Sequence, residues 1–341
     1  MVKDYISNIK NEIFSVDFDF EKVALEIFRF QAKGSAVYKN YIDALKINPE
    51  KVNSINKIPF LPIQFFKSHK IITASQPETI FISSGTTGSE RSNHYVADTK
   101  FYEQSFLKCF ELFYGNIEEY SLLALMPGPP GHPSSDGIGV AITQSSLVFM
   151  TSELIRRTKN PLSGFYLNEF ERLFDVIEHF QKQKQKFILF GLTYALLDFA
   201  QWLNSPLRGA RGHIIETGGM KGRRREAVRE EVHKTLCEAF GVPEIHSEYG
   251  MTELLSQAYS KGKGIFKCPP WAKIFIRDVN DPAQLMENKK TGGINIIDLA
   301  NIYSCSFIAT QDLGKKYDDG SFEVLGRFDD SDLRGCNLMV E

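Results

Sequence analysis

The sequence contains few cysteines, and they are not arranged to hold a metal ion or a disulfide framework. Its five cysteines, an odd number, form no C-x-x-C pair and no zinc-ligand spacing. This usage is typical of a reducing compartment. The first residues, "MVKDYISNIKNEIF", carry acids where an export signal needs an apolar core. We therefore expect a cytoplasmic protein without an export signal.

Long hydrophobic runs and a charge excess are also missing. The most apolar long stretch, "KFILFGLTYALLDFAQWL", is interrupted by Gly191, Asp198 and Gln201, which predicts a buried strand followed by a helix. The formal net charge of −2 offers no general attraction to nucleic acid. The one basic stretch, from Lys221, interleaves Arg with Glu in the pattern of a solvated helix face. We expect neither a membrane span nor a nucleic-acid partner.

The sequence has instead an ordinary globular composition with an α/β pattern. Its 341 residues, 43% hydrophobic and 24% charged, are enough for more than one subdomain. Apolar residues at three- and four-residue spacing predict helices over 20–32 and 35–47. From about residue 79, apolar strands alternate with helical patterns, which predicts mostly parallel strands. The predicted strands are 79–83, 121–127, 186–191 and 212–218, and the helices are 99–113, 167–183 and 224–241.

The pattern changes after about residue 273 to closely spaced strands and turns. The strands are expected over 272–279, 291–299, 303–310 and 321–326. Such spacing predicts a small antiparallel sheet or barrel.

The segment "SSGTTGSER", residues 83–91, follows a predicted strand and has the composition of a phosphate-binding loop. Its glycines let backbone amides approach an anion, its hydroxyls can donate to phosphate oxygens, and its arginine supplies positive charge. A plain surface turn explains the same composition, and the Walker A pattern is absent from the chain. The candidate residues are Ser83, Ser84, Gly85, Thr86, Thr87, Gly88 and Arg91.

Two later segments carry further candidates, each with a structural alternative. In "EIHSEYGMTELL", Tyr249 can stack on a base or lie in the core, and Glu253 can ligate magnesium or open a helix. Thr252 between them can bond a phosphate. Asp312, in "QDLG" after a strand, can accept hydrogen bonds from a ribose. Arg327, in "GRFDD", forms a hinge or ends a strand.

Taken together and in this order, "SSGTTGSER", "YGMTE", "QDLG" and "GRFDDSDLRG" resemble the signature motifs of the adenylate-forming superfamily. Within it the chain is most similar to the acyl-protein synthetases, the fatty-acid-activating ligases of the luciferin-component type. The resemblance runs from about residue 79 almost to the end. It implies an α/β large domain of two mixed or parallel sheets with flanking helices, plus a small C-terminal β subdomain. Only fourteen residues follow Arg327, so the usual mobile C-terminal domain and its lysine are expected to be absent.

The resemblance also divides the chain into four parts. It implies a helical N-terminal region of the large domain over 1–78 and an α/β nucleotide-binding core over 79–272. A β-rich subdomain would cover 273–326, and a hinge-like segment with an acyl-accepting tail would cover 327–341.

The resemblance implies ATP and Mg²⁺ as cofactors and gives each candidate residue a role. The loop from Ser83 to Gly88 would surround the β- and γ-phosphates, with Arg91 standing where many relatives have Lys. Glu253 would hold magnesium and Thr252 would contact the α-phosphate. The adenosine would be bound by Gly218, Gly219, Tyr249, Gly250, Asp312 and Arg327, with Tyr249 on adenine and Asp312 on the ribose hydroxyls.

Two further residues are candidates on the acyl side. His132, in "PGPPGHPSSDG", stands where the acyl pocket is expected, although a lone histidine is more often structural. Cys336 lies near the C-terminus, where acyl-protein synthetases carry the acyl group as a thioester. A thiolate readily intercepts a reactive mixed anhydride, which supports that role. The alternative for Cys336 is a small buried hydrophobe, as we expect for the other four cysteines.

The resulting prediction is an acid–thiol ligase. It would activate a carboxylic acid, with a fatty acid as first choice, as the acyl adenylate, with release of pyrophosphate. The acyl group would pass to Cys336 and then to a partner, either a reductase or an acyl carrier. Two alternatives stay open: transfer to an external thiol of CoA or a carrier protein, and a non-catalytic nucleotide-binding module.

Overall fold

Parallel strands form one half of the molecule. The computed structural model describes residues 2–84, 90–132, 144–207, 212–218 and 228–327. Five strands lie side by side in the order β8-β7-β6-β4-β5, and every neighbouring pair is parallel. They are β4 (Ser121–Leu125), β5 (Gly164–Phe165), β6 (Phe187–Leu192), β7 (Gly212–Thr217) and β8 (His246–Tyr249). All residues of β4 and β6 are buried, as expected for apolar strands covered on both faces.

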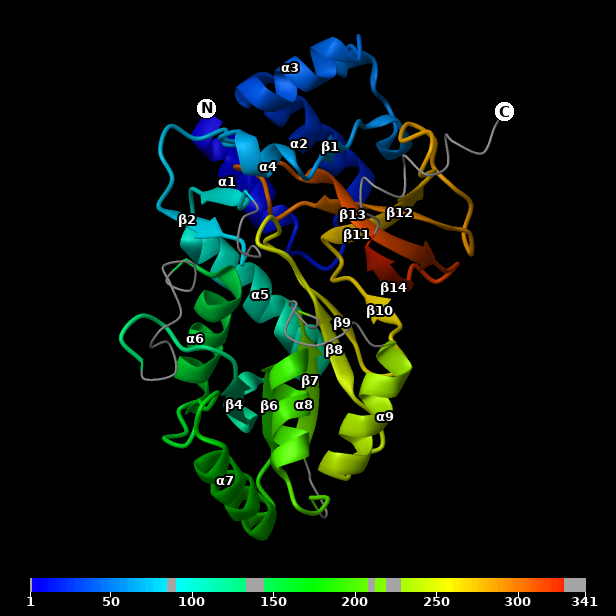
Figure 1. The fold of residues 1–341 in the computed structure, drawn as a ribbon. Coiled ribbons are helices and arrows are strands. Elements are labelled where there is room, and N and C mark those ends of the chain that lie inside the picture. The colour runs from blue at the N-terminus through cyan, green and yellow to red at the C-terminus, as the bar shows by residue number, and fades with distance from the viewer. Residues whose placement is uncertain (1, 85–89, 133–143, 208–211, 219–227, 328–341) are drawn as a thin grey trace, which may run out of the picture.

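Helices flank these strands. They are α5 (Thr99–Tyr114), α6 (Ser146–Thr158), α7 (Phe170–Gln183), α8 (Thr193–Trp202) and α9 (Arg229–Phe240), with the short helix η3 (Ile117–Glu119) before β4. In Figure 1, α8 lies in front of β6 and β7, and α9 lies beside it. Asp98 caps α5 by accepting a hydrogen bond from the Phe101 amide, which fixes where that helix begins. The predicted alternation of strands and helices is confirmed here.

The strand predicted at 79–83 does not belong to the parallel sheet. It is β2 (Thr79–Ile82), which pairs only with the antiparallel strand β3 (Asn93–Val96) in a separate two-stranded sheet. The two strands precede and follow the segment "SSGTTGSER" in the chain. The sequence correctly predicts a strand at this position. The expectation of parallel pairing does not hold for it, because its partner β3 is the next strand along the chain and pairs antiparallel.

The C-terminal strands are antiparallel as predicted, but they are not a separate sheet. The hydrogen-bonded order runs on from β8 through β9, β10, β14, β13 and β12 to β11. β13 begins later than the predicted strand at 303–310 and continues through "QDLGKK", which places Asp312 within a strand. The bounds are β9 (Ala258–Ser260), β10 (Phe266–Lys267), β11 (Ala272–Arg277), β12 (Thr291–Asp298), β13 (Phe307–Lys316) and β14 (Phe322–Arg327).

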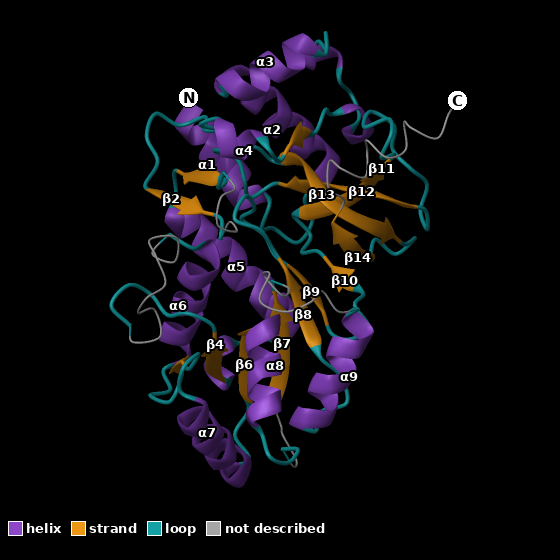
Figure 2. Cartoon of the chain, viewed as in Figure 1, coloured by secondary structure: helices purple, strands orange, loops and turns teal. Residues whose placement is uncertain are grey.

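The N-terminal helices pack on these C-terminal strands. Figure 2 shows them together at one end of the molecule. The rings of Phe28 and Phe307 pack edge-on, with their centroids 5.9 Å apart. In addition, β1 (Leu61–Pro62) pairs in parallel with β13. Both ends of the described chain therefore build one region in space. The helices are α1 (Val2–Glu12), α2 (Phe20–Gly34), α3 (Ala36–Ala44) and α4 (Phe65–Ser68), with η1 (Pro49–Lys51) and η2 (Ile55–Lys57).

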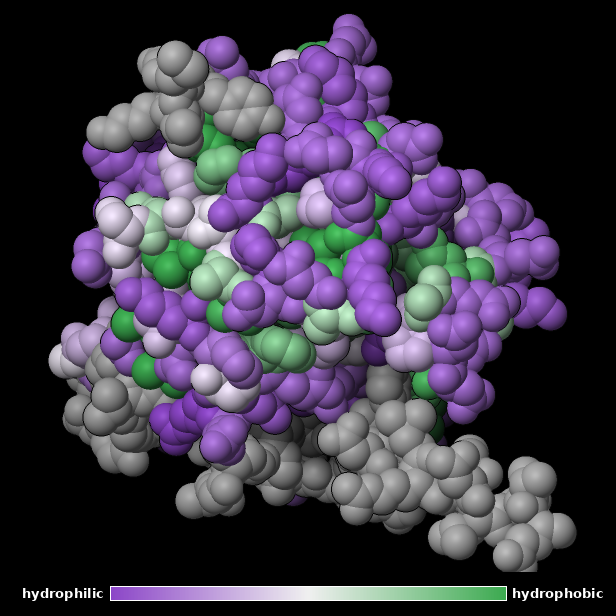
Figure 3. All heavy atoms as spheres, turned by 90° about the horizontal axis from the view of Figure 1, so that it is seen from above, coloured by the Kyte–Doolittle hydropathy of each residue, from purple (hydrophilic) through white to green (hydrophobic). Residues whose placement is uncertain are grey.

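The surface of the molecule is mixed in polarity. Seen from above, hydrophilic side chains predominate, and apolar ones appear in patches between them (Figure 3). Among the described residues, no helix combines the length and the apolar character needed to cross a membrane.

Candidate active site

One group of the predicted site residues lies where two of the parallel strands end. The carboxyl ends of parallel strands meet at one edge of a sheet, which is where α/β proteins usually bind ligands. Gly218 directly follows β7, and Tyr249 is the last residue of β8. Gly218 has φ +78°, a backbone conformation that favours glycine. Gly250 follows β8, and a Cβ there would lie 2.3 Å from Glu248 Oε1.

The structure brings Tyr249, Asp312 and Arg327 together. The Tyr249 hydroxyl donates to Asp312 Oδ2 at 2.8 Å, and Arg327 Nε donates to Asp312 Oδ1 at 3.2 Å. Asp312 and Arg327 are cross-strand partners of β13 and β14. Burial and the charge of Asp312 raise the pKa of Tyr249 well above its ordinary value. The second, third and fourth motifs therefore meet at the Asp312 carboxylate.

The first motif is linked to the same cluster by Ser83 and Ser92, the hydrogen-bonded pair at the two ends of the loop, which we call its neck. The Ser83 amide donates to the Ser92 carbonyl at 3.0 Å, and the Ser92 amide donates to Ser83 Oγ at 2.9 Å. Burial raises the pKa of Glu253, and interactions with the Ser92 hydroxyl and the charge of Arg327 offset part of that rise. Glu253 is therefore within electrostatic reach of both Ser92 and the Asp312–Arg327 pair.

Other predicted site residues are exposed, half-buried or outside the described residues. Ser84 and Arg91 are exposed at the two sides of the loop, and Thr252 is half-buried. The predicted residues Gly85, Thr86, Thr87, Gly88, Gly219 and Cys336 lie outside the described residues.

His132 lies across the sheet from this cluster. Its ring packs against Phe165 of β5, with ring centroids 5.6 Å apart, and folds back over Gly128. β5 is four strands from β8 in the sheet order, which is about 19 Å at the usual strand spacing. The assignment of His132 to an acyl pocket stays a prediction.

Three buried polar residues that sequence reasoning missed hold the "YGMTE" segment. The Asp298 carboxylate accepts hydrogen bonds from the backbone amides of Leu255 and Ser256, at 2.8 and 3.1 Å. His94 and Asn301 contact the carbonyls of Thr252 and Glu253. In the sequence, only their positions distinguish these residues. His94 follows the first motif in β3, and Asp298 and Asn301 lie in "DLAN", at the end of the apolar strand β12.

The residues around Glu253 fit a magnesium ion in their chemistry. Magnesium prefers oxygen ligands and is usually held by one or two carboxylates together with substrate phosphates. Glu253 offers a buried carboxylate beside the hydroxyl of Ser92. Within the described ranges, no group of three or more His, Cys, Asp and Glu side chains is arranged to hold a metal ion.

The described cysteines are poor nucleophiles. Cys109 and Cys305 are buried, as predicted, while Cys237 and Cys268 are half-buried. Burial raises the pKa of all four thiols, to about 12 for Cys268 and Cys305. Thiolate formation at neutral pH is therefore disfavoured at each of them.

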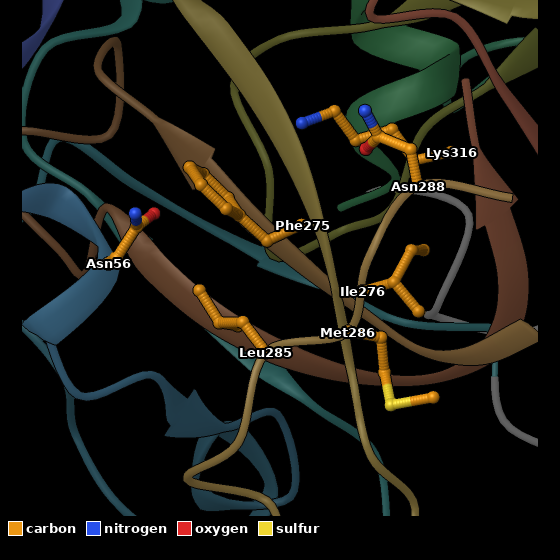
Figure 4. Close-up of a pocket in the computed structure, with 7 residues that line it drawn as sticks. All are labelled: Asn56, Phe275, Ile276, Leu285, Met286, Asn288 and Lys316. Atoms are coloured by element: carbon orange, nitrogen blue, oxygen red, sulfur yellow. The ribbon is translucent and has the colours of Figure 1, made fainter. Parts of the chain in front are cut away.

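A cavity of about 270 Å³ opens in the β-rich part of the chain (Figure 4). Its lining is mixed, with four apolar side chains, two side-chain amides and one ammonium group. It is lined by Asn56, Phe275, Ile276, Leu285, Met286, Asn288 and Lys316. None of these is a predicted site residue, so the cavity is a separate feature from the cluster at Asp312.

Comparison with known proteins places this arrangement in a family. Residues 15–341 match the sequence profile of the family described as "Acyl-protein synthetase, LuxE". No curated protein matches the chain.

Solved structures with a similar fold are ligases. ATP-bound MatB from Rhodopseudomonas palustris aligns with a TM-score of 0.53 and 15% identity over 84% of this chain and 52% of MatB. 2-Hydroxyisobutyryl-CoA ligase in complex with 2-HIB-AMP aligns with a TM-score of 0.64 and 12% identity over 91% of this chain and 68% of that ligase. At such identities the likeness shows the fold, and it confirms the predicted fold class. The chain spans about half the length of MatB.

Proposed function

The chain belongs to the acyl-protein synthetase family, and from this premise we propose that it activates a carboxylic acid as an acyl adenylate with ATP and magnesium. The observation that carries the proposal is the convergence of the four motifs. Tyr249, Asp312 and Arg327 form one hydrogen-bonded cluster. The buried carboxylate of Glu253 is within electrostatic reach of that cluster and of Ser92, next to the loop. Similar folds that hold ATP in MatB and 2-HIB-AMP in the hydroxyisobutyryl ligase support it.

In the proposed reaction, a carboxylate oxygen of the acid attacks the α-phosphorus of ATP. A bond from that oxygen to phosphorus forms, the bond to the bridging oxygen of pyrophosphate breaks, and pyrophosphate leaves. The acid is already ionised at neutral pH, so no general base is needed. Catalysis then comes from positioning the reactants and neutralising the phosphate charge.

Each residue of the cluster has a proposed part in holding the nucleotide. Asp312 accepts hydrogen bonds from the ribose hydroxyls, because a carboxylate has more acceptor sites than Tyr249 and Arg327 occupy. Tyr249 is the proposed contact of the base. Thr252 and the loop from Ser83 to Gly88, with Arg91, bind the phosphates.

Glu253 is the proposed ligand of magnesium. The bound ion would neutralise charge on the phosphate oxygens during the transfer. The chain's own contribution is to hold the carboxylate in place, buried near the Ser92 hydroxyl.

We also propose that a fatty acid is the substrate and that Cys336 accepts the acyl group. The thiolate would attack the acyl carbonyl, form a thioester and release AMP. The raised pKa values of the four described cysteines disfavour them as acceptors, which supports Cys336 or an external thiol. A reductase or an acyl carrier, in the cytoplasm, is the proposed final acceptor.

The direct test is acid-dependent release of pyrophosphate from MgATP over a panel of fatty and aryl acids. We expect release with a subset of the acids and little without acid. Mass spectrometry of the C-terminal peptide should then show a hydroxylamine-labile acyl adduct. An unchanged background rate across the panel would reject the ligase activity and leave a nucleotide-binding module.

The acceptor is tested separately. A Cys336→Ser variant that still releases pyrophosphate but forms no adduct supports the proposal. If that variant still forms a thioester product with added CoA or carrier protein, the external thiol is the acceptor.

A further inference from the structure

Two buried side chains hold consecutive carbonyl groups of the proposed magnesium-binding segment. His94 Nδ1 donates to the Thr252 carbonyl at 2.7 Å, and Asn301 Nδ2 donates to the Glu253 carbonyl at 2.8 Å. His94 and Asn301 are both 0% exposed. The backbone that carries the Glu253 side chain is therefore gripped from two sides.

The two holding residues also contact each other. His94 Nε2 lies 3.0 Å from Asn301 Oδ1, so the two side chains are neighbours beside Thr252 and Glu253. The His94 ring packs edge-on against Phe66, with centroids 5.7 Å apart. Two fully buried side chains in contact with each other and with an aromatic ring have little freedom to rotate.

Asn301 is anchored in turn by helix α2. The Gln31 amide nitrogen donates to the carbonyls of Asn301 and Ile302, each at 2.9 Å, and to Ser306 Oγ at 3.1 Å. The Gln31 amide oxygen accepts from the Ser306 backbone amide at 2.9 Å. Gln31 is also 0% exposed. A chain of buried hydrogen bonds therefore joins the N-terminal helical region to the Glu253 backbone.

His94 is anchored on the other side by the phosphate-loop hairpin. It lies in β3, two residues after Ser92, which precedes that strand and whose hydroxyl offsets part of the rise in the Glu253 pKa. The same hairpin thus holds the Thr252 carbonyl through His94 and brings Ser92 close to Glu253. A displacement of the Asn301 turn would be transmitted to the place where Glu253 meets the loop.

We infer that Asn301, anchored by Gln31, is a positioning residue that orients Glu253 toward the metal of the bound nucleotide. Groups that hold a metal ligand in place govern metal affinity through the ligand's orientation. Burying the polar side chains of His94, Asn301 and Gln31 costs free energy unless each is hydrogen-bonded. Here His94 and Asn301 bond two consecutive carbonyls of one short segment, and Gln31 bonds the Asn301 backbone. The inference rests on the proposed function, because it takes Glu253 as the magnesium ligand.

The test measures binding of α,β-methylene-ATP by calorimetry, once with excess Mg²⁺ and once with EDTA. The ratio of the two dissociation constants reports the metal's contribution. Asn301→Leu should reduce that ratio about five- to tenfold, the effect of one lost buried hydrogen bond, and leave binding in EDTA unchanged. Asn301→Asp has the size of the native residue but cannot donate to the Glu253 carbonyl, and it should act in the same direction.

Two controls separate positioning from loss of stability. Tyr38→Phe removes another buried hydrogen bond, from the Tyr38 hydroxyl to the Pro59 carbonyl at 2.6 Å, and should leave the ratio unchanged. Glu253→Gln should lower the ratio, and adding Asn301→Leu to it should lower it no further, because both changes act through one group.

The inference is overturned if Asn301→Leu weakens binding equally with and without metal, or if Tyr38→Phe lowers the ratio as much. It is also overturned if the two effects add in the double variant, or if the native chain binds the analogue without regard to Mg²⁺. Failure of acid-dependent pyrophosphate release with intact metal-dependent binding would instead reject the proposed function alone.

Discussion

Asparagine at position 312 would remove one negative charge from the proposed nucleotide site and leave the size of the side chain unchanged. Asp312 is 5% exposed, and its oxygens accept hydrogen bonds from Tyr249 and Arg327. An amide oxygen can still accept from Tyr249, so we expect Asp312→Asn to fold. The negative charge that we propose as the acceptor for the ribose hydroxyls would be lost.

The expected cost to stability is small. The Arg327 side chain is 76% exposed, so its ion pair with Asp312 is screened by solvent and contributes well under ~1 kcal/mol. The bond from Tyr249 changes from a charged to a neutral acceptor, at a cost of about 1 kcal/mol. The free energy of unfolding should therefore fall by about 1–2 kcal/mol, measured by urea denaturation.

The cost to nucleotide binding should be specific to the ribose. Hydrogen bonds to a charged acceptor contribute about 1.5–3 kcal/mol and those to a neutral acceptor about 1 kcal/mol. A loss of about 1–2 kcal/mol weakens binding roughly 5- to 30-fold. The native chain should prefer a ribonucleotide over its 2′,3′-dideoxy analogue, and Asp312→Asn should lose most of that preference.

The assay is calorimetric titration of both nucleotides into both proteins. Asp318→Asn is the matched control, because Asp318 is an exposed aspartate at the turn between β13 and β14 that pairs with Lys289. It should leave the ribose preference unchanged. If Asp312→Asn keeps the full preference for the ribonucleotide, the assignment of Asp312 to the ribose is refuted.

Three further predictions follow from other parts of the structure. Gly250→Ala should destabilise the protein by about 1–3 kcal/mol, because the new Cβ would lie 2.3 Å from the buried Glu248 carboxylate. Gly34→Ala, whose Cβ would have ordinary contacts from 3.4 Å, should not. Burial, helped by the charges of His213 and Lys261, lowers the pKa of His246 from 6.5 to about 4, so the unfolded chain binds more protons between these values. Stability measured by urea unfolding should therefore rise with pH across that window, with about 1–3 kcal/mol of the rise from His246. Burial also lowers the pKa of His94 to about 4, so His246→Asn should reduce the rise in part, whereas His69→Asn should leave it unchanged. Hydroxylamine-labile acylation of the C-terminal peptide should disappear in Cys336→Ser and persist in Cys237→Ser; acylation that survives the first change would reject Cys336 as acceptor.

The parts of the fold predicted from sequence are those set by local pattern. The continuous apolar runs that became β4 and β6 and the helical spacing of α5 and α7 depend only on nearby residues. The continuation of the sheet from β8 and β9 into β10 and the C-terminal strand β14 depends on contacts between distant segments, which no local pattern encodes. The pairing of β2 with β3 joins consecutive strands, but β3 was not among the predicted strands.

The site residues also divide into those that the sequence predicts and those that only the fold reveals. Tyr249 and Asp312 are 63 positions apart and were predicted as site residues because the motifs carry a family resemblance. His94 and Asn301 lie outside those motifs and are 207 positions apart. Each looks like an ordinary polar residue at the edge of an apolar segment. Only the folded chain shows that they hold the Thr252–Glu253 backbone.

The most direct test of the central claim is a crystal structure with α,β-methylene-ATP and Mg²⁺. The account predicts the ribose at Asp312, the metal at Glu253 and the phosphates at the loop that begins at Ser83. Nucleotide bound elsewhere, for example in the cavity beside Phe275, with Glu253 free of metal, would contradict it.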